Sequence, residues 1–201
     1  MILIGYSGHA FVVYGILQSA GKKVTGYCDV LEKEFNPFGL SYQGTEFSEP
    51  GLKSLKQNDF VIAVGDNGIR KKIQEQLEKE NLAPVNAIHP SVVIDPSATV
   101  ANHGVMIAAG VIINPLSVIG KGTICNTGCI IEHECMVGGF AHIGPGAVLC
   151  GNVRIGDQTF VGANAVIRQG IVIGKNAVIG AGAVVVKDVP DNMTVVGVPA
   201  K

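Results

Sequence analysis

The chain has 201 residues and a net charge of −1, with 47% hydrophobic, 15% charged and 5% aromatic residues. Proteins that bind nucleic acid need an excess of Lys and Arg, so this charge balance argues against a nucleic-acid partner. The longest apolar tract runs from Val105 to Ile119 and contains Asn114 and Pro115. It is too short and too interrupted to predict a membrane span.

The lack of a signal-peptide pattern and the spacing of the cysteines predict a cytoplasmic protein. The first residues show no basic stretch followed by an apolar run and a small-residue cleavage site, which argues against a signal peptide. The five cysteines are odd in number and lack Cys-x-x-Cys spacing, so they favour neither a disulfide framework nor a thiolate zinc site. We expect reduced thiols, mostly packed in the interior.

The distribution of charge divides the chain in two. Of the first 87 residues 19 are charged, against 9 of the 84 from Ile107 to Pro190. We therefore expect one domain over residues 1–87 and a second over 88–201. The first region alternates strand and helix patterns, which predicts a small parallel α/β unit of the Rossmann-like kind. Its expected elements are strands at 2–4, 23–28 and 59–64 and helices at 11–20 and 69–80.

One edge of this predicted sheet carries the candidate ligand contacts. Gly5 and Gly8 flank Ser7 in a turn that follows the first strand and opens the first helix, where backbone N–H groups and the helix dipole face an anion. Ala10 replaces the third glycine of the dinucleotide motif, so a nucleotide-sugar is favoured over a bound dinucleotide cofactor. Asp29 and Gly65 follow two other strands at the same edge, and the Asp29 carboxylate can accept hydrogen bonds from a ribose or a base.

From Ile88 onward the sequence repeats every six residues. An α-helix cannot keep an apolar residue on one face at this period, whereas short strands joined by sharp turns can. The period predicts a triangular parallel β-solenoid with about 18 residues per coil. We expect the aliphatic residue of each hexapeptide to point inward, with a one-residue insertion between Val100 and Ile107: Ile88, Ile94, Val100, Ile107, Ile113, Ile119, Ile131, Val137, Ile143, Leu149, Ile155, Val161, Ile167, Ile173, Ile179 and Val185, with Cys125 in the same series.

His133 and Glu134 interrupt this charge-poor repeat at a turn. An imidazole titrates close to working pH, so His133 can act as a general base, and Glu134 can orient the imidazolium as the acid of a triad does. The alternative is a solvated corner pair without chemistry. His142 lies half a coil farther along and therefore faces another side of the solenoid. If both histidines serve one reaction, the site lies between subunits and a homotrimer is expected.

Three segments carry a resemblance to known proteins. Ile-Gly-x-x-Ala-x repeats that end in Asp188-Val189-Pro190 and Gly197-Val198-Pro199-Ala200-Lys201 resemble the hexapeptide acyltransferases, whose fold is a left-handed parallel β-helix. The Gly-x-Ser-Gly-His turn, Gly65-x-Asn67-x-Ile69-Arg70 and the segment 126–135 together resemble the nucleotide-amino-sugar N-acetyltransferases of the bacillosamine pathway. GDP-perosamine N-acetyltransferases and the sialic acid O-acetyltransferase group are related to them.

This resemblance covers essentially the whole chain and implies roles for individual residues. It implies transfer of an acetyl group from acetyl-CoA to the amine of a nucleotide-linked amino-deoxy sugar, with UDP-4-amino-4,6-dideoxy-N-acetylglucosamine favoured as acceptor. Acetyl-CoA is a cosubstrate, and no bound cofactor or metal is expected. The implied catalytic residues are His133 and Glu134, the implied acetyl-CoA contacts are His142, Ala163 and Ala181, and the implied substrate contacts are Ser7, Gly8, His9, Asp29, Val30 and Gly65.

The geometry of the repeat is compatible with these roles. Thr127, Pro145, Ala163 and Ala181 are each 18 residues apart and therefore share one edge, where small residues leave a groove for an extended pantetheine arm. Cys125, Cys129 and Cys135 occupy inward or corner positions, which disfavours a catalytic thiol.

Three alternatives stay open at this stage. The same base could activate a sugar hydroxyl, giving an O-acetyltransferase acting on sialic acid or another sugar. A metal hydratase of the γ-carbonic anhydrase type would use histidines such as His89, His103, His133 and His142, although their spacings place them at dissimilar corners. A noncatalytic nucleotide-sugar-binding module would bind the substrate without consuming a thioester.

Overall fold

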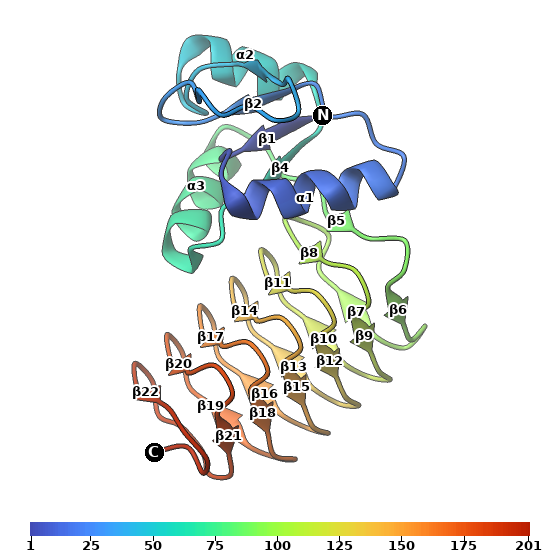
Figure 1. Cartoon of the computed structure of the whole chain (residues 1–201), viewed down its shortest axis with the longest axis vertical. Coiled ribbons are helices and arrows are strands. Elements are labelled where there is room, and N and C mark those ends of the chain that lie inside the picture. The colour runs from blue at the N-terminus through green and yellow to red at the C-terminus, as the bar shows by residue number, and fades with distance from the viewer.

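The computed structural model describes residues 1–201 as an α/β unit that sits on a three-faced coil of short strands (Figure 1). The four strands of the α/β unit are all parallel, in the order β3-β2-β1-β4. Three of them are buried at every residue, as expected of a parallel sheet covered on both faces. The strands are β1 (Ile2–Ile4), β2 (Gly26–Cys28), β3 (Ser41–Tyr42) and β4 (Phe60–Ile62).

Helices cover both faces of this sheet. One face packs on α1 (Gly8–Ser19), and the other packs on α2 (Glu49–Gln57) and α3 (Asn67–Lys79). The N-terminus of α3 is capped by the Asp66 carboxylate, which accepts a hydrogen bond from the Ile69 backbone N–H at 2.8 Å. None of the three helices combines the length and the apolarity that crossing a bilayer requires.

The remainder of the chain forms a parallel β-helix with seven-, six- and five-stranded faces. The seven-stranded face contains β5 (Ala87–Ile88), β8 (Met106–Ile107), β11 (Ile124–Cys125), β14 (His142–Ile143), β17 (Phe160–Val161), β20 (Val178–Ile179) and β22 (Thr194–Val195). The six-stranded face contains β6 (Val93–Ile94), β9 (Ile112–Ile113), β12 (Ile130–Ile131), β15 (Val148–Leu149), β18 (Val166–Ile167) and β21 (Val184–Val185). The five-stranded face contains β7 (Thr99–Val100), β10 (Val118–Ile119), β13 (Met136–Val137), β16 (Arg154–Ile155) and β19 (Val172–Ile173).

The register between coils confirms the hexapeptide prediction. Ile124 pairs with His142, and His142 pairs with Phe160, so one coil takes 18 residues. The first coil takes 19, because Ala87 pairs with Met106, which confirms the one-residue insertion.

The turns repeat as regularly as the strands. Every sixth residue from Gly104 to Gly182 has a positive φ, and at ten of these fourteen turns it is Gly or Asn, the residues that adopt this conformation at least cost. The four others are Leu116, Glu134, Phe140 and Gln158.

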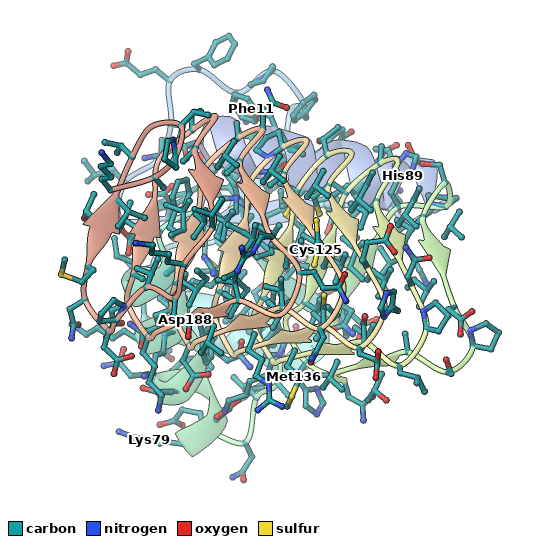
Figure 2. All side chains as sticks on the ribbon, turned by 90° about the horizontal axis from the view of Figure 1, so that it is seen from below. Phe11, Lys79, His89, Cys125, Met136 and Asp188 are labelled. Carbon is teal, nitrogen blue, oxygen red and sulfur yellow. The ribbon has the colours of Figure 1, made fainter.

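The coil core is aliphatic apart from three cysteines and contains no aromatic side chain. It contains 27 buried residues from Val105 to Val195, among them Cys125, which lies inside the coils while Met136 projects outside (Figure 2). Three residues of the first coil depart from the prediction that every aliphatic position is buried: Ile88 is 36% exposed, and Ile94 and Val100 are only partly buried. The reason is their place in the first coil, where no further coil covers them.

The α/β unit and the coil share a second core. Ala10 and Val13 of α1 pack in one cluster with Met106, Ala108 and Ile124 from the seven-stranded face. This contact covers the first coils of that face and leaves Phe160 and Val178 exposed farther along it.

Candidate functional site

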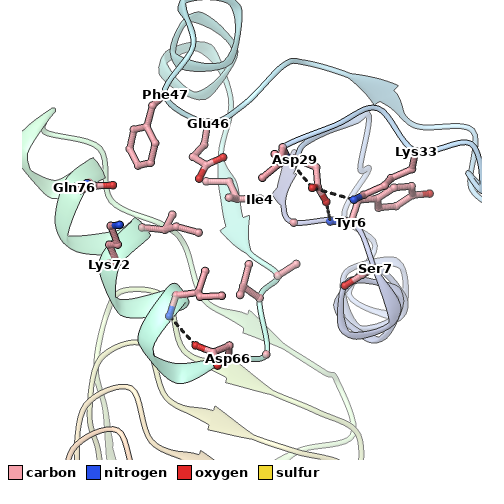
Figure 3. A pocket seen from close by; sticks show the side chains of 17 residues that line it. Ile4, Tyr6, Ser7, Asp29, Lys33, Glu46, Phe47, Asp66, Lys72 and Gln76 are labelled. Atoms are coloured by element: carbon pink, nitrogen blue, oxygen red, sulfur yellow. Dashed lines mark hydrogen bonds and ion pairs between the residues drawn. The ribbon is translucent and has the colours of Figure 1, made fainter.

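A cavity of about 720 Å³ lies at the carboxyl edge of the four-stranded sheet (Figure 3). Five residues predicted to lie at this edge line it, namely Gly5, Ser7, Asp29, Val30 and Gly65. Gly8 and His9, which were predicted with them, do not line this cavity. The α/β edge is thus hollowed where ligands of parallel sheets bind.

Asp29 is held by its own domain. Its Oδ2 accepts a hydrogen bond from the Tyr6 backbone N–H at 2.8 Å, and its Oδ1 accepts one from the Val30 N–H at 2.7 Å. Lys33 adds an ion pair at 3.1 Å, visible in Figure 3. The carboxylate therefore orders the turn after β1. Because it already makes these contacts, only part of its hydrogen-bond-accepting capacity is left for a ligand in the cavity.

Other residues that line the cavity come from segments whose sequence does not mark them as a binding site. Glu46 and Phe47 lie on one wall, and Lys72 and Gln76 project from α3 (Figure 3). Glu46 forms no ion pair, and Phe47 is 39% exposed. A carboxylate acceptor, an ammonium donor and an aromatic face in one cavity suit a ligand with a base, hydroxyl groups and phosphates.

His9 lies instead at the junction of the two domains. Its ring centroid is 6.2 Å from that of His142 on β14, and its Cγ lies 3.5 Å from the position a Cβ would take at Gly65. Burial, followed by the charge of Arg70, lowers the pKa of each imidazole to about 4. Both rings are therefore neutral at physiological pH.

His142 has one polar partner. Its Nε2 lies 3.1 Å from Nδ2 of Asn126 in the preceding coil, and its Nδ1 is buried without a partner, as is Nε2 of His9. The predicted acetyl-CoA contact and the predicted substrate contact thus meet at one place. Both of these ring nitrogens are buried at the junction of the two domains.

Arg70 of α3 joins the domains beside this pair. Its side chain is 1% exposed and donates from Nε to the Gly122 carbonyl at 2.7 Å and from Nη2 to the Phe140 carbonyl at 2.9 Å. From Nη1 it also donates to the Gly65 carbonyl at 3.0 Å. Burial lowers the pKa of Arg70 to about 10, which leaves the guanidinium charged at neutral pH.

His133 and Glu134 lie at a different corner, between the six- and five-stranded faces. Both side chains are about half exposed, and His133 Nδ1 lies 3.0 Å from Glu134 Oε2. Glu134 has φ of 62°, a conformation that a glutamate adopts only with strain. Because Glu134 holds Nδ1, the ring nitrogen left for another group is Nε2.

The predicted acetyl-CoA edge lies at the corner between the seven- and six-stranded faces. Backbone hydrogen bonds join its coils, from Gly146 N–H to the Thr127 carbonyl and from Gly182 N–H to the Ala163 carbonyl. Ala163 is half-buried and Ala181 is exposed. This edge and the His133 corner are separated by the whole six-stranded face, so one chain does not bring them together.

No group of three or more His, Cys, Asp or Glu side chains in this chain is arranged to hold a metal ion. The histidines considered for a hydratase, His89, His103, His133 and His142, do not gather. Cys125, Cys129 and Cys135 are free and buried, and burial raises the pKa of the Cys135 thiol to about 11.

Known proteins resemble each part of the chain. Residues 1–77 match the family model described as PglD N-terminal domain, and residues 152–187 match the hexapeptide repeat of succinyl-transferase. UDP-N-acetylbacillosamine N-acetyltransferase of Bacillus subtilis is 32% identical over 110 residues, which cover 53% of this chain and 50% of that protein. The match thus spans half the length of this curated relative.

Solved structures extend the similarity to the whole chain. A mutant perosamine N-acetyltransferase from Caulobacter crescentus, in complex with CoA and GDP-perosamine, is 37% identical with a TM-score of 0.93, covering 100% of this chain and 94% of that one. The acetyltransferase domain of PglB from Neisseria gonorrhoeae, in complex with acetyl coenzyme A, is 36% identical with a TM-score of 0.92, covering 100% and 97%.

These matches confirm the expected fold, a Rossmann-like α/β domain followed by the left-handed parallel β-helix that the resemblance implied. The solved structures also contain both domains in one enzyme, since each match covers the whole of this chain. The chain belongs to the hexapeptide-repeat nucleotide-amino-sugar N-acetyltransferases, acyltransferases that use acetyl-CoA as cosubstrate.

Proposed function

We propose that this protein acetylates the amino group of a nucleotide-linked amino-deoxy sugar, with UDP-4-amino-4,6-dideoxy-N-acetylglucosamine as its acceptor. The observation that carries the proposal is the His133–Glu134 pair, a solvent-accessible imidazole held at Nδ1 by a carboxylate on a fold shared with acetyl-CoA-dependent sugar acetyltransferases. The relative in Bacillus subtilis is a UDP-N-acetylbacillosamine N-acetyltransferase, and this supports the choice of nucleotide and sugar.

The mechanism is direct transfer without a covalent enzyme intermediate. His133 Nε2 takes a proton from the sugar amine as its nitrogen attacks the thioester carbonyl of acetyl-CoA. The tetrahedral intermediate then collapses, the carbon–sulfur bond breaks, and the CoA thiolate receives the proton from the imidazolium. Glu134 stabilises the imidazolium and holds the ring in orientation. The buried thiols are not needed in this scheme.

The two domains divide the binding work. Residues 1–87 hold the nucleotide-sugar, with Ser7, Gly8, His9, Asp29, Val30 and Gly65 as contacts, and residues 88–201 hold acetyl-CoA, with His142, Ala163 and Ala181 as contacts. Support for this division comes from the cavity at the sheet edge and from the meeting of His9 with His142 at the domain junction.

The active sites lie between the subunits of a homotrimer. Within one chain the six-stranded face separates His133 from the acetyl-CoA edge, so a neighbouring subunit must supply one of them. The outward side of that face supports the assembly, because its outward residue in every coil is aliphatic and is exposed at Val93 and partly exposed in the other coils: Ile112, Ile130, Val148, Val166 and Val184. A column of this kind is the surface that a second copy would cover.

The test is release of free CoA from acetyl-CoA with a panel of UDP- and GDP-linked 4-amino sugars, and with sialic acid as a hydroxyl acceptor. Mass spectrometry identifies the acetylated product. We expect turnover with the UDP-linked amine and none with sialic acid. Turnover with a GDP-linked amine alone would contradict the assignment of UDP as the nucleotide. Turnover with a hydroxyl acceptor alone would contradict N-acetylation. Binding without CoA release would indicate a noncatalytic module.

A further inference from the structure

We propose that Gly151 is a positioning residue for the His133 imidazole: the side chain that it lacks leaves the space in which the ring lies. The inference rests on the proposed function only in taking His133 as the base. The geometric part stands without it, because it concerns where the ring lies and what holds it there.

Gly151 occupies the turn directly beside His133, one coil later. Backbone hydrogen bonds fix these turns on one another, from Glu134 N–H to the Pro115 carbonyl at 2.9 Å and from Asn152 N–H to the His133 carbonyl at 2.8 Å. The next turn is held in the same way, by Gly170 N–H and the Gly151 carbonyl at 3.0 Å. The distance between the two backbones is therefore set by the coil and cannot open to admit a larger group.

The imidazole lies over Gly151. A Cβ at position 151 would overlap Cε1 of His133 and would come within 2.5 Å of Nε2 and 3.2 Å of Cδ2. Glu134 holds the opposite side of the ring through Nδ1 at 3.0 Å. The Glu134 carboxylate thus holds the ring at Nδ1. The Nε2 side of the ring fits beside residue 151 only because that residue is glycine.

The backbone itself does not require glycine at this place. Gly151 is absent from the residues with positive φ, and the same position of the hexapeptide is alanine at Ala109, Ala163 and Ala181. An alanine at 151 therefore fits the coil. What it displaces is the end of a half-exposed side chain, which can swing away at little cost to stability. Loss of ring position is the expected effect, and loss of folding is not.

The first test is Gly151→Ala, with Gly139→Ala as the matched control. Gly139 has the same position in the repeat and no positive φ, and a Cβ there would meet its nearest atom at 3.5 Å, an ordinary contact. We expect kcat of Gly151→Ala to fall about 100-fold or more, since a misplacement of about 1 Å can cost that much. KM for both substrates and the Tm should stay close to those of the wild type and of Gly139→Ala. Retention of more than half the wild-type kcat would overturn the proposal.

The second test asks whether Gly151 acts through His133. In the His133→Ala background the Gly151→Ala change should lower kcat no further, because the ring it displaces is already absent. An equal additional loss there would show an independent role and reject the positioning role.

A third measurement does not need acetyl transfer, so it separates failure of this inference from failure of the proposed function. NMR chemical shifts of the His133 ring nitrogens are recorded with and without Glu134→Gln. In the wild type the Glu134 change should move the Nδ1 chemical shift, because the carboxylate contacts Nδ1; in Gly151→Ala it should have little effect. An identical response in both backgrounds would contradict the inference even in a protein that transfers no acetyl group.

Discussion

His9 and His142 lie with their ring centroids 6.2 Å apart, one on α1 of the α/β domain and the other on β14 of the β-helix. Each ring has a buried nitrogen without a hydrogen-bond partner. The neighbouring guanidinium of Arg70 is also buried, so a positive charge on either imidazole would be both desolvated and repelled. The domain junction is therefore built for two neutral rings.

This pair makes the stability of the protein sensitive to acid. The folded-state pKa of each ring is about 4 and lies below the unfolded value of 6.5, so the unfolded chain binds more protons between these two values. The free energy of unfolding is highest above pH 6.5 and falls by on the order of 1–3 kcal/mol for each ring as the pH falls toward 4.

Urea unfolding between pH 7.5 and 4.5 measures the slope of the free energy of unfolding against pH. The double variant His9→Asn, His142→Asn should have a flatter slope than His103→Asn, which alters an exposed histidine outside the pair; equal slopes would contradict the prediction.

Arg70 is expected to be the main polar link between the domains. Arg70→Met leaves the buried carbonyls of Gly122 and Phe140 without their donor, and an unpaired buried polar group costs about 1–3 kcal/mol. We therefore expect a loss of about 3 kcal/mol or more in the free energy of unfolding, measured with urea at pH 7. Arg70→Lys should recover little, because one ammonium cannot replace the guanidinium at carbonyls on both sides. Arg154→Met, at an exposed arginine, is the control, and a loss no larger than its own would refute the linking role.

Much of the fold can be read from the sequence because the repeat leaves a strong periodic signal. An inward aliphatic residue every six residues predicts the coil, the register between coils and the one-residue insertion after Val100. Helix α2 and strand β3 were not predicted, since α2 is short and its apolar residues Leu52 and Leu55 are few among lysines and polar residues. The helix α1 begins at Gly8, three residues earlier than expected from its apolar pattern, because Ser7 is its N-cap residue and the first turn, from Gly8 to Ala10, already has helical backbone.

The site was predictable only where residue type broke a local rule. His133 and Glu134 stood out as charge in a charge-poor repeat, and Gly5 and Gly65 stood out at strand ends. Glu46 and Lys72 did not, because a carboxylate or a lysine in a charged segment resembles an ordinary surface residue until the chain brings it to a cavity. Arg70 belongs to the motif that carries the resemblance, but its burial and its link between the domains could not be predicted, because they depend on the coil turns packed against α3. Gly151 could not be told from the many glycines of the repeat before the His133 ring was placed over it.

Replacing His133 tests the base directly. We expect His133→Ala to lower kcat about 10²- to 10⁴-fold while nucleotide-sugar binding changes little, since general-base catalysis contributes a factor of that size. Steady-state CoA release gives kcat, and calorimetry with the nucleotide-sugar gives the binding constant. Turnover near that of the wild type would remove His133 from the mechanism. The control is His89→Ala, which alters a histidine at another corner.

Glu134 should show a trade between stability and activity. It has φ of 62° at a turn position where Gly or Asn is usual, and the left-handed conformation costs most L-residues about 1–2 kcal/mol. Glu134→Asn should therefore raise the stability, by up to about 1 kcal/mol after the loss of its exposed contact with His133, and should lower kcat. Leu116→Asn relieves the same strain one coil earlier, where φ is also 62°, and is the matched control. Leu116→Asn should stabilise the protein and keep its activity. If Glu134→Asn were as active as Leu116→Asn, Glu134 would have no role in orienting the His133 ring during catalysis.

The intersubunit site can be tested by mixing two inactive variants. His133→Ala and His142→Ala are each expected to abolish most turnover, but they alter residues that lie at different corners of one chain. When the two proteins are unfolded together in equal amounts and refolded, random assembly should give about one site in four that receives an intact His133 from one subunit and an intact His142 from its neighbour. We therefore expect about a quarter of wild-type activity to return.

The same mixture distinguishes the alternative arrangement, because a site contained in one subunit would always carry one of the two defects and no activity would return. A variant that keeps the subunits apart gives the matching control. Replacing Val148 by Asp puts a charge on the aliphatic outward column of the six-stranded face, where a partner would desolvate it at a cost of several kcal/mol. Light scattering should show Val148→Asp as a monomer that still binds the nucleotide-sugar at its α/β domain but does not release CoA. A fully active monomer would place the whole reaction within one chain and contradict the trimeric site.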